Sequence, residues 1–166
     1  MDLVIGEGIS SVQRMQKARA ALVHALEDIF SSMYGETAEI VSDTQISDTP
    51  RISSMIGFGG ESSGFVALHF TGEMACSVTA GLLGMQVREV DETVRDTVAE
   101  MANMVGGGLR NQMSSAHDNF KLSLPSVVQG LEYSTKGPAG SQEVLIGVVA
   151  GPYQFKVQLV LEKKSL

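Results

Sequence analysis

The sequence is poor in cysteine and in long apolar runs. Its single cysteine, Cys76, excludes an intrachain disulfide and a thiolate-rich zinc site. The longest apolar run, 144–150, is far shorter than the ~18 residues that a membrane-spanning helix needs. The first residues lack the basic start and the apolar stretch of a signal peptide. We therefore expect a soluble, cytoplasmic protein without membrane insertion.

Basic residues are also scarce. Lys and Arg number 12 against 19 Asp and Glu, which gives a net charge of −7. A nucleic-acid phosphate backbone attracts clustered positive charge, and the densest basic cluster here is the pair Lys163 and Lys164. The charge balance therefore predicts no nucleic-acid partner.

Apolar residues, by contrast, are plentiful. The 166 residues are 43% hydrophobic, enough to bury a full core in one domain of ordinary size. We therefore expect residues 1–166 to form a single domain.

Helical periodicity predicts two long helices and a short one. Apolar residues at spacings of three, four and seven predict an amphipathic helix over 9–34 that stops at Gly35. A short helix is predicted over 73–83, closed by Gly84. The second long helix begins near Asp91, whose carboxylate can cap it, and runs to about residue 114.

The remaining segments show strand patterns. The clearest is 153–161, where apolar and polar side chains alternate. The other predicted strands are 37–41, 52–58, 64–70, 125–131 and 143–150. Helix followed by three strands thus occurs twice, which indicates a weak internal duplication. The predicted fold class is α+β: two pseudo-repeated halves in which long amphipathic helices pack on an antiparallel sheet.

The second long helix carries the most informative segment. On a helical wheel, the apolar side chains fall within about 60° of Val94 and form the buried face. Asp96, Glu100, Asn103 and Gly107 fall on the opposite side. The wheel therefore predicts that the carboxylate of Glu100 and the amide of Asn103 lie one turn apart and face water.

Three consecutive glycines, 106–108, follow these residues. Each helical glycine costs about 1 kcal/mol relative to alanine, so a run of three calls for a reason. Gly107 would leave bare backbone beside Glu100 and Asn103, where something could approach the helix closely. The alternative is that both polar side chains are merely solvated and the glycines only end the helix.

The sequence also resembles a known family. The segment 96–108 (DTVAEMANMVGGG), together with 123–130 (SLPSVVQG), resembles the CheC/CheX/FliY family of chemotaxis phosphatases, in particular its single-site CheX branch. Further similarity lies in 55–58, 64–68 and 82–84. The resemblance implies a CheC/CheX-like fold and hydrolysis of the phospho-aspartate of a CheY-like receiver domain in chemotaxis or two-component signalling.

The resemblance also implies residue roles. Glu100 would dock against the receiver's lysine, and Asn103 would orient the attacking water. Asp96 would dock the partner, cap its helix or only be solvated. On the helical wheel Met104 flanks Glu100 and Gly107 leaves bare backbone, so we expect both to contact the partner. The receiver would supply Mg²⁺, so this chain would need no cofactor of its own. Such roles suit the side chains, because phosphoryl transfer is mostly positioning and an amide adds no negative charge beside the phosphoryl group.

Two further expectations come from the resemblance. Two-site members repeat the motif in the first long helix, where this chain has Phe30 at the asparagine position. Phe30 cannot position water, so we expect one site per chain. The family also suggests a homodimer, which no residue pattern here demands.

Other candidate sites are less favoured. The Gly-x-Ser-x-Gly pattern at 60–64 joins two predicted strands, so we interpret it as a hairpin turn rather than a nucleophile elbow. His24, His69 and His117 show no ligand spacing, and we expect no metal site. Cys76 has no basic neighbours and is interpreted as a small core residue.

Two alternatives to the phosphatase remain open at this stage. The first is a non-catalytic module of the same fold that docks a receiver or a flagellar-switch partner. The second is a regulator of unknown ligand. Asn103 discriminates, because a pure docking surface does not need an amide at that position.

Overall fold

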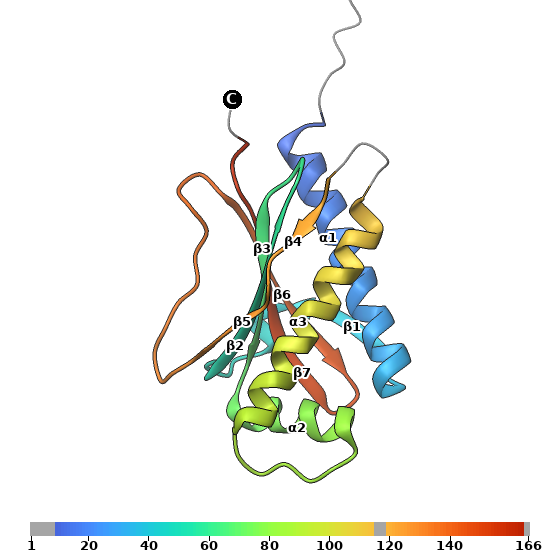
Figure 1. The fold of residues 1–166 in the computed structure, drawn as a ribbon, viewed down its shortest axis with the longest axis vertical. Helices are drawn as coiled ribbons and strands as arrows, with labels where there is room; N and C mark the ends of the chain where they lie inside the picture. Colours follow the sequence, from blue (N-terminus) through green and yellow to red (C-terminus); the bar gives the residue numbers. More distant parts are fainter. Residues whose placement is uncertain (1–8, 115–118, 165–166) are drawn as a thin grey trace, which may run out of the picture.

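The computed structural model describes residues 9–114 and 119–164 (Figure 1). Its helices are α1 (Ser11–Ile29), α2 (Gly72–Leu83) and α3 (Glu92–Met113), with a π-helical turn at Phe30–Tyr34 and a 3-10 turn at Asp43–Gln45. Its strands are β1 (Ala38–Ser42), β2 (Ile52–Gly59), β3 (Gly64–Phe70), β4 (Lys121–Leu122), β5 (Ser126–Gln129), β6 (Gln142–Ala150) and β7 (Tyr153–Leu161). The α+β class predicted from the sequence is confirmed.

All the strands belong to one antiparallel sheet in the order β1-β6-β7-β3-β2-β4, with β5 also paired to β2. The hairpins β2–β3 and β6–β7 meet at the centre through β3 and β7. Each half contributes its leading strands to the other half's hairpin: β1 pairs with β6, and β4 and β5 pair with β2. The two halves are therefore interleaved in one sheet and are not separate layers.

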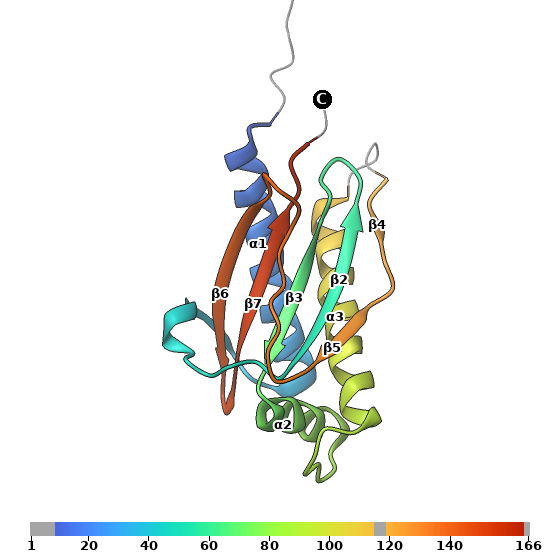
Figure 2. The same cartoon turned by 90° about the vertical axis from the view of Figure 1, so that its left-hand side faces the viewer.

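The long helices α1 and α3 lie side by side on one face of the sheet, and α2 crosses its end (Figures 1 and 2). Side chains of β7 show why the core forms there. Phe155, Val157 and Leu159 all point to the helix face and are fully buried, which is the alternation read from the sequence. Phe155 packs between Phe30 and Phe70, with ring centroids 5.7 and 4.8 Å away.

Local signals fix the helix ends. Ser10 forms a capping box with Gln13 at the start of α1. Asp91 caps α3, its Oδ1 accepting from the Val94 amide at 3.0 Å. Gly35 and Gly84 adopt φ of 65° and 64° at the ends of the first helical segment and of α2, a conformation that glycine adopts without strain. The predicted stops at both glycines are confirmed.

Two predicted elements differ from the observed ones by more than a residue at an end, and one strand was missed. The helix predicted over 9–34 is α-helical only over Ser11–Ile29, because its last turn widens into a π-helical turn. Ile9, Val12 and Met33, which fit the apolar stripe, lie beyond or at the ends of the packed region and are exposed. The strand predicted over 125–131 is shorter, Ser126–Gln129, since it lies at the edge of the sheet. The two-residue strand β4 was not predicted.

Candidate functional site

Helix α3 presents the candidate residues because its apolar stripe fixes its rotation. The stripe is buried against the sheet and α1, and comprises Val94, Val98, Met101, Val105 and Leu109. The opposite side therefore faces solvent, and Glu100 and Asn103 are both exposed there. The structure thus places the carboxylate and the amide as the helical wheel predicts, one turn apart and outward.

Asp96 is also exposed on α3, one turn before Glu100. The N-terminal cap of the helix is Asp91 and not Asp96, so capping does not account for the second carboxylate. Negative side chains near a helix N-terminus are favoured by the helix dipole. Asp96 and Glu100 together make this half of the exposed helix face acidic.

The three glycines do not end the helix, which continues to Met113. Two of them have a packing reason. A Cβ at Gly106 would lie 3.0 Å from the Ile56 side chain, and a Cβ at Gly108 would lie 2.5 Å from the Cβ of Ala25. Gly106 therefore lets α3 approach the sheet, and Gly108 lets it approach α1.

Gly107 is different, because a Cβ there would meet nothing within 4 Å. No contact within the described residues explains this glycine, although it costs about 1 kcal/mol relative to alanine in a helix. It lies one turn beyond Asn103 on the exposed side. Bare backbone beside an exposed amide is suited to close approach by another molecule.

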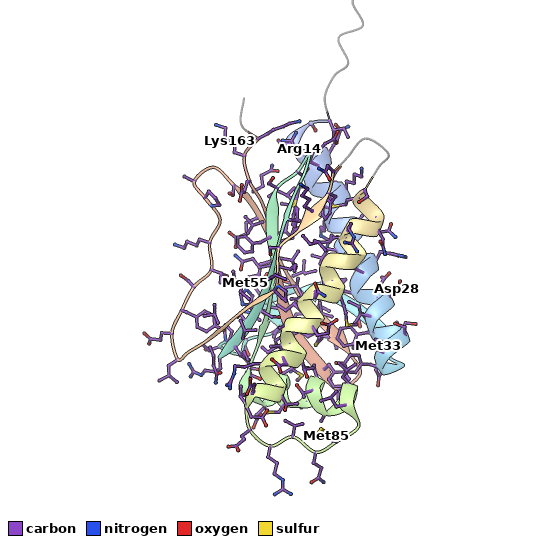
Figure 3. The ribbon with its side chains drawn as sticks, in the orientation of Figure 1. Arg14, Asp28, Met33, Met55, Met85 and Lys163 are labelled. Atoms are coloured by element: carbon purple, nitrogen blue, oxygen red, sulfur yellow. The ribbon has the colours of Figure 1, made fainter. Side chains whose placement is uncertain are left out.

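A shallow groove of about 330 Å³ runs between α1 and α3 beside this position. Met104 and Gly107 line it from α3, and His24 and Asp28 line it from α1. Asp28 lies on the exposed side of α1 (Figure 3). Sequence reasoning missed the α1 residues, since helical periodicity gives each helix's buried face but not which helix lies next to it.

Met104 and Phe30 are the two remaining candidate residues, and neither is fully exposed. Met104 is half-buried, packs against the core and borders the groove. Phe30, which occupies the place of a second-site asparagine, is fully buried in the aromatic cluster. A side chain in that position points into the core, away from any partner.

Other sequence signals have structural explanations. The Gly-x-Ser-x-Gly segment forms the turn of the β2–β3 hairpin, as predicted. Cys76 is buried, and burial together with nearby Asp91 raises the pKa of its thiol. Both effects disfavour the nucleophilic thiolate.

In residues 9–114 and 119–164, no three His, Cys, Asp or Glu side chains come close enough together to hold a metal ion. His117 lies outside the described residues. Within the described part of the chain, no helix combines the length and the apolar character needed to cross a membrane.

Comparison with known proteins identifies the family. The sequence model described as "Chemotaxis phosphatase CheX" matches residues 52–148, more than half of the chain and including α3. The chain belongs to the CheX family. This match bears out the resemblance carried by the Glu100 and Asn103 segment.

A curated relative, the CheY-P phosphatase CheX of Thermotoga maritima, is 26% identical over 84 residues. That match covers 50% of this chain and 54% of the relative, so it spans about half of the relative's length.

Solved CheX structures share the fold. The chemotaxis protein CheX of Desulfovibrio desulfuricans is 23% identical, with a TM-score of 0.72 over 88% of this chain and 99% of that one. The CheX-CheY-BeF3-Mg²⁺ complex of Borrelia burgdorferi contains a chain that is 16% identical, with a TM-score of 0.69 over 94% of this chain and 100% of that one. These likenesses extend the CheX fold beyond the segment that the family model matches.

Proposed function

We propose that this protein is a phosphatase that hydrolyses the phospho-aspartate of a CheY-like receiver domain. The observation that carries the proposal is the exposure of Glu100 and Asn103 on one side of α3, in a chain of the CheX family. A site on a convex helix suits a substrate that is itself a folded domain with a pocket. The phosphorylated residue would lie in the receiver's pocket, and α3 would lie against its rim.

In this proposal Asn103 is the catalytic residue. Its amide can accept one hydrogen bond from water and donate another, so it can hold the water in line with the phosphorus atom. Holding the water in place removes much of the entropic barrier to attack. A neutral side chain is needed, because a carboxylate would repel the phosphoryl oxygens.

Glu100 would dock and orient the receiver. Its carboxylate would pair with a lysine at the rim of the receiver's pocket, a charge-assisted contact that strengthens as water is excluded. Asp96, one turn earlier, would extend the acidic surface toward the same partner. The receiver would supply Mg²⁺, which neutralises phosphoryl charge during transfer, and this chain would need no metal of its own.

Gly107 and Met104 would complete the contact surface. The open space above Gly107 allows the receiver's backbone to approach α3 beside Asn103. Met104 borders the site on the α1 side, and its flexible side chain adapts to an irregular partner surface. The protein would act in the cytoplasm, and a homodimer through the sheet edges is compatible with its single exposed site.

The direct test is to phosphorylate a CheY-type receiver domain and follow the decay of the phosphoryl group with and without this protein. Accelerated decay that depends on Asn103 is the expected result. Decay at the receiver's own rate, with binding retained, would favour the alternative of a non-catalytic receiver-docking or flagellar-switch module. Decay at that rate without binding would contradict both.

A further inference from the structure

The second face of the sheet is crossed by residues 130–141, here called the strap. The strap connects β5 to β6 on the side of the sheet away from α1 and α3 (Figure 1). It has no regular secondary structure, and none of its side chains belongs to the hydrophobic core. Most connections in compact domains are shorter than this one.

The strap is what covers this face. Ser53, Gln158 and Val160 point to the side away from the long helices, yet at most 2% of each is exposed. Gly137 of the strap lies directly over Val160, where an added Cβ would come within 2.4 Å of Cγ1. Met55 also lies on this face (Figure 3). Lifting the strap would therefore expose polar and apolar sheet residues together.

A chain of hydrogen bonds, here called the clasp, holds the strap down. Its members are Ser53, His69 and Gln158 of the sheet and Tyr133 and Thr135 of the strap. The Tyr133 hydroxyl lies 2.7 Å from Ser53 Oγ, which lies 2.6 Å from His69 Nδ1. His69 Nε2 lies 2.9 Å from Gln158 Oε1. Gln158 Nε2 donates to the Thr135 carbonyl at 2.9 Å, and the Thr135 hydroxyl donates to Gln158 Oε1.

The partners of Gln158 determine which atom is the donor in each hydrogen bond of the clasp. Its Nε2 donates to two acceptors, the Thr135 carbonyl and Glu143 Oε1, so its Oε1 faces His69 as an acceptor. His69 must then carry its proton on Nε2. In the neutral ring Nδ1 is left as an acceptor, which requires Ser53 to donate to it. Ser53 in turn accepts from Tyr133.

Protonation of His69 would exchange the donor and acceptor roles between His69 and Ser53 in the clasp. A proton on Nδ1 would need Ser53 Oγ as its acceptor, so the Ser53 hydroxyl could no longer donate to His69. The Ser53 hydrogen would then have to turn toward the phenolic oxygen of Tyr133 or out of the clasp, so the bond between Ser53 and Tyr133 would be rearranged. The positive charge would also lie between Ser53 and Gln158, the two sheet residues that bond to the strap, where partial burial penalises it.

The surrounding charges partly oppose one another. Lys156 of β7 disfavours the charged ring and Glu143 of β6 favours it, while burial has the largest effect and lowers the pKa of His69. Asp48 lines the same small hollow as His69 and Lys156. Arg51, whose guanidinium donates to the Leu131 carbonyl, adds positive charge near Tyr133.

We propose that the strap is a pH-operated cover: neutral His69 holds it on the sheet through the clasp, and protonation of His69 releases it. The clasp lies on the face away from α3, so the test needs no receiver domain. Its outcome is therefore independent of the proposed phosphatase activity.

The test is backbone NMR relaxation of the whole protein between about pH 7.5 and about pH 4.5. Order parameters of residues 131–136 should fall from near 0.85 to below about 0.6 as the His69 ring titrates, while those of β7 stay high. In His69→Gln, which does not titrate, the strap should show no such transition. His24→Gln removes an exposed histidine on α1 and should retain it.

A strap that stays rigid while His69 titrates, or that moves only when β7 unfolds with it, would overturn the proposal. Tyr133→Phe gives a second test that leaves His69 intact. It removes only the hydroxyl that contacts Ser53 and leaves the Thr135–Gln158 bonds in place, so the order parameters of residues 131–134 should already be lower at neutral pH. Unchanged order parameters there would show that the bond between Tyr133 and Ser53 does not hold the strap, which would overturn the proposed link from His69 to the strap.

Discussion

Asn103 and Gly107 lie one turn apart on the exposed side of α3, and the glycine leaves the space beside the amide open. The helix accepts a less stable residue there, although the described residues make no use of the space. In the proposed site, helix stability and close approach of the partner therefore make opposite demands on position 107.

Asn103→Ala should lower the phosphatase rate by about 10²-fold or more, because one preorganised polar group is lost at the reacting atoms. Receiver binding should be largely retained. The measurement is decay of a phosphorylated receiver, with Gln154→Ala as the control, since it removes an exposed amide from the sheet. Equal rates for Asn103→Ala and the unmodified protein would remove the catalytic role.

Glu100→Lys should weaken receiver binding, since it replaces one partner of the proposed ion pair with a like charge. Loss of one member of a buried charge pair costs about 2–5 kcal/mol in binding. Titration calorimetry with a receiver charged with beryllofluoride and Mg²⁺ measures the effect. Glu132→Lys makes the same change of charge on the strap, and its affinity should stay near that of the unmodified protein.

Gly107→Ala and Gly108→Ala should change stability in opposite directions. Alanine at 107 enters open space and should stabilise the helix by up to about 1 kcal/mol. Alanine at 108 would meet Ala25 at 2.5 Å and should destabilise the fold by about 1–3 kcal/mol. Urea unfolding measures both changes. The stabilised Gly107→Ala protein should nonetheless bind the receiver less tightly, and unchanged affinity would argue against close approach there.

Phe30→Asn should not create a second phosphatase site. Position 30 is fully buried, so the new amide would face the core and not a receiver. Loss of the ring should destabilise the protein by about 3–5 kcal/mol. Thermal unfolding and the decay assay on the folded fraction check both expectations. A higher rate per folded molecule would mean that this end of α1 can present a side chain outward.

Stability should fall as the pH drops below about 6.5, because burial holds the pKa of His69 below its ordinary value of 6.5. The unfolded chain then binds a proton that the folded protein does not bind. The stabilisation that comes from neutral His69 is complete above about pH 6.5, and it is lost as the pH falls toward the folded-state pKa of His69. His69→Gln should flatten this part of the stability profile in urea unfolding, and an unchanged slope would assign the loss to other groups.

The sequence predicted the elements that one short-range pattern specifies. Alternation in 153–161 gave β7, and the apolar stripe of α3 gave the outward placement of Glu100 and Asn103, because a regular helix turns by a constant angle. The family resemblance then attached chemistry to that exposed face. None of these inferences required knowledge of which segments pair.

Strand pairing and contacts between distant segments could not be predicted from the sequence. Nothing in the alternation of 38–42 says that β1 pairs with β6 and not with β2. The clasp joins residues that lie up to 105 positions apart, from Ser53 to Gln158, so no local pattern could reveal it. The two-residue strand β4 is too short to show a period at all.

The crossing of β1 and β5 between the halves has a consequence for how such a chain could arise. A half-length polypeptide folded alone would have its own hairpin but no neighbour for that hairpin's outer edge. In two such copies, each hairpin edge would be paired if the leading strand of one copy added to the hairpin of the other. The present sheet has the form of such a swapped pair, so neither half is complete without the leading strand of the other.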